Sequence, residues 1–228
     1  DVNGNIVRTA QKIDAIDKAA SRLPDAVKDK DIVIITMPYN EVEDVYEIIA
    51  PNLRTGAVVV DMSPLKQKPI QLAEKYLQDG THIVGATPIG NPAYLWDGIE
   101  EAERATEDYF DNSAILLMPS VSCVKEAITL VSDLTEILGA TPLFFDITEH
   151  DVLMTSTQAL PMLLGVAYYR MMSQSSGWDD AQRLTGAMFG MLTHHLFDTH
   201  PDDVLQIWLD TGDDLVRHID AMMGILSE

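Results

Sequence analysis

The feature that most constrains this chain is a continuous run of β-branched residues within Asp-Ile-Val-Ile-Ile-Thr-Met-Pro, residues 31–38. A strand that is apolar at every position is typical of one buried on both faces in a parallel sheet. Similar runs recur at residues 57–62, 82–88, 114–119 and 142–146, with helical patterns between them. Strands that alternate with helices predict βαβ crossovers, and hence an α/β fold with a Rossmann-like, doubly wound parallel sheet.

The strand pattern stops after residue 147, and the remainder has the periodicity of helices. Residues 153–172 are apolar on nearly every side, which is typical of a helix buried in a core or an interface. Two further helices are predicted at residues 178–197 and 201–226. We therefore expect two domains, an α/β domain at 1–147 and an all-α domain at 148–228.

The beginning of the chain lacks a motif that such a sheet needs to bind a dinucleotide. That motif is a glycine-rich turn between the first strand and helix, where backbone N–H groups hold the pyrophosphate. No G-x-G-x-x-G pattern occurs in the 228 residues, and residues 1–30 contain one amphipathic helical stretch and no strand. The pattern predicts an α/β domain that is incomplete at its N-terminus.

Composition narrows the classes of partner. The chain has 36 Asp and Glu against 15 Lys and Arg, a formal net charge of −21. Binding to nucleic acid or anionic lipid depends on clustered cations, so neither is expected as a partner. No apolar run approaches the roughly 20 residues that cross a membrane. The single cysteine, Cys123, fits a reducing compartment, so the cytoplasm is the expected location.

Five segments of the chain, taken together, resemble one family. Residues 31–38, 58–70, 82–90, 138–151 and 156–169 occur in the order seen in prephenate dehydrogenases. The resemblance implies an oxidoreductase of tyrosine biosynthesis that decarboxylates prephenate or arogenate and passes hydride to NAD or NADP. It also implies that the first domain binds the dinucleotide and that the helical domain binds the small-molecule substrate and forms a homodimer.

The resemblance also implies where the cofactor lies. Nicotinamide would lie over Thr36, Met37 and Pro38, and Asp1 would occupy the place of the acidic residue that holds the adenosine ribose. Asp1 could equally begin a turn at a frayed terminus. NAD or NADP is thus the implied cofactor, although the glycine-rich turn that holds its pyrophosphate is not found in the chain.

Three residues are implied as catalytic, namely Ser63, Lys66 and Thr87. The family has an Asp-x-x-Ser-x-Lys-like segment, and here Asp61 and Lys66 keep their spacing while the serine falls one position early. Ser63 could also be a plain loop residue before a helix. In the family, a proton-accepting histidine occupies the position of Thr87. A threonine hydroxyl does not titrate near neutral pH, so Thr87 can orient a substrate but cannot act as an unaided base.

On the helical side, the resemblance implies Gln158 and Arg183 as substrate-binding residues, although Arg183 could equally be a structural, salt-bridged arginine. Met162 and Met191 stand near positions where the family has a histidine and an arginine, which weakens the expected anion site. A rival hypothesis is therefore a non-catalytic dimeric relative with a ligand-binding or regulatory role.

The sequence Thr-His-His-Leu-Phe-Asp-Thr-His-Pro-Asp-Asp, residues 193–203, places histidines and carboxylates close together. Imidazole and carboxylate groups at such spacing can bind zinc. We favour structural roles at a helix end, so no metal site is predicted. Two further residues are interpreted as structural rather than catalytic: His150, at the expected domain junction, and the lone Cys123.

Overall fold

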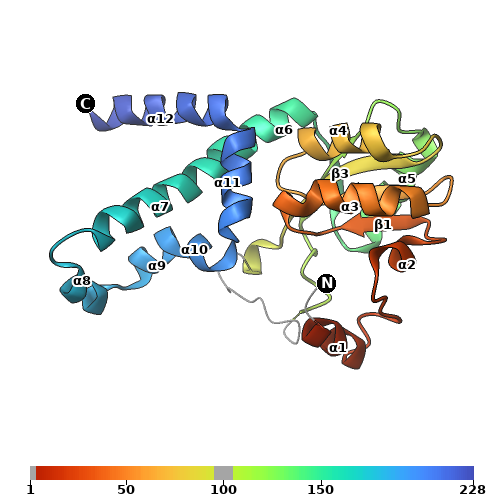
Figure 1. Cartoon of the computed structure of the whole chain (residues 1–228), viewed down its shortest axis with the longest axis horizontal. Coiled ribbons are helices and arrows are strands. Elements are labelled where there is room, and N and C mark those ends of the chain that lie inside the picture. Colours follow the sequence, from red (N-terminus) through yellow and green to blue (C-terminus); the bar gives the residue numbers. More distant parts are fainter. Residues whose placement is uncertain (1–3, 95–104) are drawn as a thin grey trace. The chain divides into compact units, whose positions relative to one another are not determined.

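The computed structural model describes residues 4–94 and 105–228, so Asp1 lies outside the described residues. The chain divides into two compact units, Asp1–Ile147 and Thr148–Glu228. Figure 1 shows strands in the first unit and helices in the second.

The described part of the first unit contains a five-stranded sheet in the order β1-β2-β3-β4-β5. The sequence prediction of an α/β sheet followed by helices is confirmed, and all five predicted strands form. Their bounds are Ile32–Ile35 (β1), Val58–Asp61 (β2), His82–Ile89 (β3), Ala114–Pro119 (β4) and Thr141–Phe144 (β5).

One neighbouring pair of strands departs from the predicted parallel arrangement. β1 with β2, β2 with β3, and β4 with β5 are parallel, whereas β3 and β4 are antiparallel. Ala114, the first residue of β4, pairs with Ile89, the last residue of β3. β4 therefore begins at the edge of the sheet where β3 ends and runs back alongside β3. A strand parallel to β3 would have to begin at the opposite edge.

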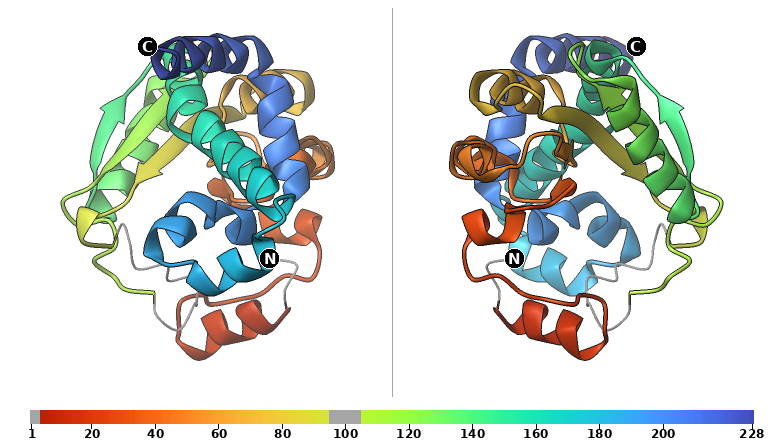
Figure 2. Two further views of the ribbon diagram at one scale, coloured as in Figure 1. Left: turned by 90° about the vertical axis from the view of Figure 1, so that its left-hand side faces the viewer. Right: turned by 90° about the vertical axis from the view of Figure 1, so that its right-hand side faces the viewer.

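Helices cover both faces of the sheet. α3 (Val42–Ile49) and α4 (Gln67–Tyr76) lie on one side of β3, and α5 (Lys125–Ile137) lies on the other (Figure 2). Val58 and Val60 of β2 belong to the apolar cluster that includes α5. Asp61, the next residue, faces the other layer and bonds to a side chain of α3. Successive strand residues thus point to opposite helical layers, as the pleat requires.

The three parallel strands β1, β2 and β3 are in register where β1 and β2 end, and β3 continues beyond that point to Ile89. Ile35 pairs with Asp61, and Asp61 pairs with Gly85. These ends lie at one edge of the sheet, and ligands of open α/β sheets bind outside the carboxyl ends of the strands. The register therefore decides which residues meet at that edge.

The amphipathic helical stretch predicted within residues 1–30 forms only a short helix. α1 spans Gly4–Lys12, and Asp14 just beyond it has a positive φ of 57°, a conformation that does not continue a right-handed helix. A second short helix, α2 (Leu23–Val27), precedes β1. Three 3-10 turns are also found in the described part of this unit, η1 (Tyr39–Glu41), η2 (Ala50–Asn52) and η3 (Pro92–Tyr94).

The second unit is helical, as predicted, but its helices are more broken than the periodicity indicates. The elements are α6 (Ile147–Met154), the π-helix η5 (Thr155–Ala159), α7 (Leu160–Ser173), α8 (Trp178–Leu184), α9 (Ala187–Thr193), α10 (His195–Asp198), α11 (Pro201–Asp210) and α12 (Gly212–Leu226). Gly186 is extended between α8 and α9, and Thr211 leaves helical geometry between α11 and α12. Apolar periodicity does not reveal such local breaks.

Close packing in the second unit depends on one glycine of α7. A Cβ atom at Gly165 would lie 2.5 Å from the carbonyl oxygen of Leu192 and would overlap the His195 ring. The His195 ring nitrogen Nε2 lies 3.0 Å from the Met162 carbonyl oxygen. Only a residue without a side chain allows this approach.

In the part of the chain that the structure describes, no helix is long and apolar enough to cross a membrane.

Candidate active site

The candidate site is built on the carboxyl ends of β1 and β2 and on the neighbouring second half of β3. Ile35, Asp61 and Gly85 are in register on three neighbouring strands. Met37, Ser63 and Thr87 each come two residues later along the sequence. Neighbouring strands are about 4.8 Å apart, so the strand ends bring these three residues to one edge. One of the residues predicted to contact the cofactor thus lies at the same edge as two of the three predicted catalytic residues.

The polar centre of this edge is Asp61, the last residue of the otherwise apolar strand β2. Its side chain is completely buried. Oδ1 accepts a hydrogen bond from the Ser63 backbone N–H at 2.8 Å, and Oδ2 accepts one from the Tyr46 hydroxyl at 3.0 Å. The first bond spans two residues, the Asx-turn pattern that fixes a tight change of direction. A buried carboxylate is tolerated only with such partners.

Tyr46 reaches Asp61 from α3 and is also completely buried. Burial raises the pKa of the Tyr46 phenol well above its usual value, and the negative charge and hydrogen bond of Asp61 raise it further. The phenol therefore keeps its proton at neutral pH and acts as a donor. The sequence analysis missed Tyr46, because the helical spacing of α3 marks it only as an apolar-face residue.

Lys66 lies inside the turn between β2 and α4. Its side chain is completely buried, and Nζ donates to the backbone carbonyl of Ser63 and, at 3.3 Å, to that of Asp61. A Cβ atom at Gly85 would lie only 3.0 Å from Lys66 Cδ, so the aliphatic part of the lysine passes directly against β3. These contacts of the Lys66 side chain fix the conformation of the turn.

Ser63 combines a fixed backbone with a hydroxyl that lacks a protein partner. The residue is 4% exposed, and its N–H and carbonyl both bond to buried side chains. Within residues 4–94 and 105–228, no hydrogen-bond partner is found for Ser63 Oγ. Buried polar atoms are nearly always paired, so an unpaired hydroxyl at a strand end is a reason to consider a ligand contact.

Thr87 of β3, the other predicted hydroxyl residue of the site, is partly exposed.

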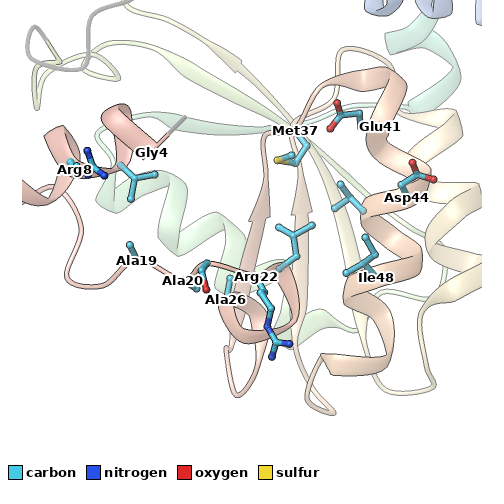
Figure 3. Close-up of a pocket in the computed structure, with 14 residues that line it drawn as sticks. Gly4, Arg8, Ala19, Ala20, Arg22, Ala26, Met37, Glu41, Asp44 and Ile48 are labelled. Atoms are coloured by element: carbon cyan, nitrogen blue, oxygen red, sulfur yellow. The ribbon is translucent and has the colours of Figure 1, made fainter. Parts of the chain in front are cut away.

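The predicted cofactor residues lie at the end of β1. Thr36 and Met37 line a cleft of about 380 Å³ along this strand. Met37 also lines a larger, open pocket of about 900 Å³ between α1, α2 and α3, shown in Figure 3. Pro38 is the residue before the turn η1. The fourth predicted residue, Asp1, lies outside the described residues.

The larger pocket has a mixed lining. Val7 and Ile48 supply apolar surface, while Arg8 and the carboxylates of Glu41 and Asp44 supply charge. Arg22, also in the lining, forms a bidentate pair with Asp25 at 2.8 and 3.1 Å. The volume of the larger pocket lies within the range for small-molecule sites. The G-x-G-x-x-G pattern is not found in the sequence, so no residue is assigned to the pyrophosphate.

The predicted substrate residues of the helical unit are on its surface. Gln158 is exposed and lies in the π-helix η5, a type of helix often found at functional sites. The Arg183 side chain is 81% exposed and lies 3.4 Å from Asp180. This weak surface pair matches the structural alternative for Arg183 and leaves its predicted substrate contact as a proposal.

The histidines near residue 200 each have a partner in the protein. His194 lies 3.2 Å from Asp198, His195 lies over Gly165, and His200 Nδ1 accepts a hydrogen bond from the Asp202 N–H. Among the described residues, no group of three or more histidine, cysteine, aspartate or glutamate side chains could hold a metal ion.

His150 and Cys123, which the sequence analysis interpreted as structural, are both partly or fully buried. His150 is buried, and its Nδ1 lies 2.8 Å from Asp151 Oδ1. Cys123 packs against the cluster beneath α5, and burial raises the pKa of its thiol. A thiol with a raised pKa is less often ionised and is therefore a weaker nucleophile.

Comparison with known protein families identifies the first unit. Residues 1–143 match the model of the prephenate dehydrogenase nucleotide-binding domain. The chain belongs to the prephenate dehydrogenase family. The resemblance drawn from the five ordered sequence segments is therefore confirmed, and the strand ends described above belong to a nucleotide-binding domain.

Relatives extend the similarity into the helical unit. The chain is 23% identical over 178 residues, 76% of its length, to cyclohexadienyl dehydrogenase from Zymomonas mobilis. Among curated relatives, the matched span is 16% or 56% of the relative's own length, so this chain corresponds to only part of each.

Solved structures of prephenate dehydrogenase family members have the same fold. One is Aquifex aeolicus prephenate dehydrogenase in complex with hydroxyphenyl propionate and NAD+. It has a TM-score of 0.81 and 20% identity, covering 100% of this chain and 77% of that one. Synechocystis arogenate dehydrogenase has a TM-score of 0.71 and 17% identity, covering 99% of this chain and 78% of that one.

Proposed function

We propose that the protein is a nicotinamide-dependent oxidoreductase of the prephenate or arogenate dehydrogenase type, with hydride passing from a small, carboxylate-bearing hydroxy substrate to NAD or NADP. The observation that carries this proposal is the register of Ile35, Asp61 and Gly85 across three neighbouring strands, because Met37, Ser63 and Thr87 each follow two residues later. The match of residues 1–143 to the family's nucleotide-binding domain supports it.

In this proposal the cofactor lies at the end of β1. Thr36, Met37 and Pro38 would contact the nicotinamide side, and the pocket beside Met37 has room for the adenosine side. When bound, the cofactor supplies the hydride acceptor. The protein's part is to hold the substrate carbon close to it, because orientation of this kind lowers the barrier by removing the entropy cost of encounter.

Ser63 and Thr87 would act on the substrate side. The buried Ser63 hydroxyl can donate a hydrogen bond to a substrate oxygen or to the nicotinamide amide, and the Thr87 hydroxyl can orient the reacting hydroxyl group. Lys66 would act indirectly, because its ammonium lies inside the turn on two backbone carbonyls. No histidine occurs in the three segments at this edge, Thr36–Pro38, Asp61–Lys66 and Thr87–Ile89. Without a histidine there to accept the proton, turnover of prephenate is expected to be slow.

The helical unit would bind the rest of the substrate, through Gln158 and Arg183, and would pair with a second copy. Large apolar side chains are prominent on its described surface: Leu184, Met188, Phe197, Leu209, Ile225 and Leu226 are each at least 66% exposed. Large exposed apolar side chains of this kind favour association.

The proposal is tested by restoring a proton acceptor in the full-length protein. We expect Thr87→His to raise the rate of NADH or NADPH formation with prephenate or arogenate by roughly 10² to 10⁴, the usual contribution of a general base. The matched control is Thr81→His, which makes the same change at the opposite end of β3, where Thr81 bonds to Gln78.

The control should leave the rate unchanged. If a folded Thr87→His variant and the unaltered protein both form no reduced nicotinamide with any combination of these substrates and cofactors, the dehydrogenase proposal is wrong. The non-catalytic, ligand-binding hypothesis would then take its place.

A further inference from the structure

We infer that Tyr46 and Asp61 form a positioning pair that fixes the backbone of Ser63 and so presents its hydroxyl to a ligand in one orientation. This inference rests on the proposed function for the role of Ser63. It goes beyond that function by assigning a role to Tyr46, which lies on α3 and belongs to no strand-end motif.

The backbone of Ser63 is held from both sides. Its N–H donates to Asp61 Oδ1 at 2.8 Å, and its carbonyl accepts from the Lys66 ammonium. All three residues are nearly or completely buried. Hydrogen bonds to charged groups are the stronger kind, and away from water the loss of one is costly. The peptide units on both sides of Ser63 therefore cannot rotate freely.

The Asp61 carboxylate is itself held in one orientation. Its other oxygen, Oδ2, accepts the Tyr46 hydroxyl at 3.0 Å, so both oxygens have a defined donor. Two donors on different oxygens fix the plane of the carboxylate, whereas one alone would leave it able to turn. Tyr46 is completely buried and keeps its proton, so this donor is permanent at neutral pH. The pair thus ties α3 to the turn after β2.

The backbone and the hydroxyl of Ser63 differ in whether they have hydrogen-bond partners. Both of its backbone polar groups are satisfied, but in the described part of the chain its buried Oγ has no partner. A buried hydroxyl without a partner reduces stability unless something else satisfies it. The buried side chains of Asp61 and Lys66 therefore fix the Ser63 backbone. The Ser63 hydroxyl remains available to a ligand carbonyl or carboxylate oxygen.

The test combines single and double substitutions in the full-length protein. The variants are Tyr46→Phe, Ser63→Ala and the two together, with Asp61→Asn as a second way to weaken the pair. Tyr76→Phe is the matched control, because the Tyr76 hydroxyl also donates to a carboxylate, Glu43 at 3.1 Å, away from the turn. The two readouts are the affinity for hydroxyphenyl propionate with NAD+ present, measured by calorimetry, and the exchange rate of the Ser63 amide hydrogen without ligand.

We expect Tyr46→Phe and Ser63→Ala each to weaken the affinity by about tenfold, and the double variant to be no weaker than Ser63→Ala alone. Tyr46→Phe and Asp61→Asn should also speed exchange of the Ser63 amide, while Tyr76→Phe should leave both readouts unchanged. Additive losses in the double variant would overturn the inference, because Tyr46 would then act independently of Ser63.

The exchange measurement separates this inference from the proposed function. If the unaltered protein binds no hydroxyphenyl propionate, the proposed function loses support, yet faster exchange at Ser63 in Tyr46→Phe would still show that Tyr46 holds the turn. Unchanged exchange in both Tyr46→Phe and Asp61→Asn would overturn the positioning role whatever the ligand does.

Discussion

The polar side chains of the turn after β2 and the polar candidate residues of the helical unit differ in burial and in bonding. In the first unit, Asp61, Ser63 and Lys66 are at most 4% exposed and bond to one another through side chain and backbone. In the helical unit, Gln158 is exposed, and the Arg183 side chain is 81% exposed with one weak partner. The first set has its geometry fixed before any ligand arrives, whereas the second does not.

This difference shows where the chain alone can define a site. Strand register aligns Ile35, Asp61 and Gly85, two residues before Met37, Ser63 and Thr87, without help from another molecule. The helical unit instead exposes large apolar side chains, among them Leu184 at 85% and Phe197 at 83%. Exposed apolar surface of this kind favours association, so we expect the candidate residues of the helical unit to depend more on a partner or substrate.

Glycine substitutions give the largest expected contrast between the two regions. In the first unit, Gly85→Ala would place a Cβ atom 3.0 Å from Lys66 Cδ and 3.5 Å from the Met118 carbonyl oxygen. Lys66 is completely buried and cannot move aside without leaving its two carbonyl partners. We expect the free energy of unfolding, measured by urea denaturation, to fall by about 1–3 kcal/mol.

The matched control is Gly224→Ala in α12, where nothing lies within 4 Å of the added Cβ atom. Alanine has the higher helix propensity, so this variant should gain up to about 1 kcal/mol. If Gly85→Ala proved as harmless as Gly224→Ala, the tightly packed turn beneath β3 would not exist as described.

Alkaline pH gives a smaller effect that is specific to the Tyr46–Asp61 pair. The pKa of Tyr46 is raised in the folded state above its ordinary value of 10.0. Its contribution to stability is therefore present below that ordinary value and is lost as pH rises through the folded pKa. Between about pH 10 and about pH 11, we expect the free energy of unfolding to fall by roughly 1 kcal/mol more in the unaltered protein than in Tyr46→Phe.

Tyr76→Phe serves again as the comparison, because Tyr76 is only partly buried and its hydroxyl bonds to the partly exposed Glu43. This variant should keep the full alkaline loss of the unaltered protein. An equal slope of stability against pH in Tyr46→Phe and the unaltered protein would mean that folding does not depend on the Tyr46 proton.

Most of the first unit's architecture can be predicted from the sequence, because a strand that is buried on both faces is a continuous apolar run. Residues 31–38 and 57–62 contain the strands β1 and β2, and the motif from Asp61 to Lys66 follows directly. The sequence does not reveal the antiparallel pairing of β3 with β4, since strand direction depends on where the chain re-enters the sheet.

Two other features could not be read from periodicity. The helical patterns at 178–197 and 201–226 break at Gly186 and Thr211, where local backbone geometry departs from the helix without changing the apolar stripe. Tyr46 looks like one more apolar-face residue of its helix. Its hydroxyl gains significance only because the register of β2 brings Asp61 beneath it.

The central claim is that the ends of β1, β2 and β3 form the ligand site, and hydrogen exchange with mass spectrometry tests it most directly. The full-length protein would be compared with and without NAD+ and hydroxyphenyl propionate. The account predicts slower exchange at residues 36–38, 62–66 and 86–90, with no change around the opposite strand end at residues 78–82. Protection confined to other segments, or absent at all three strand ends, would contradict it.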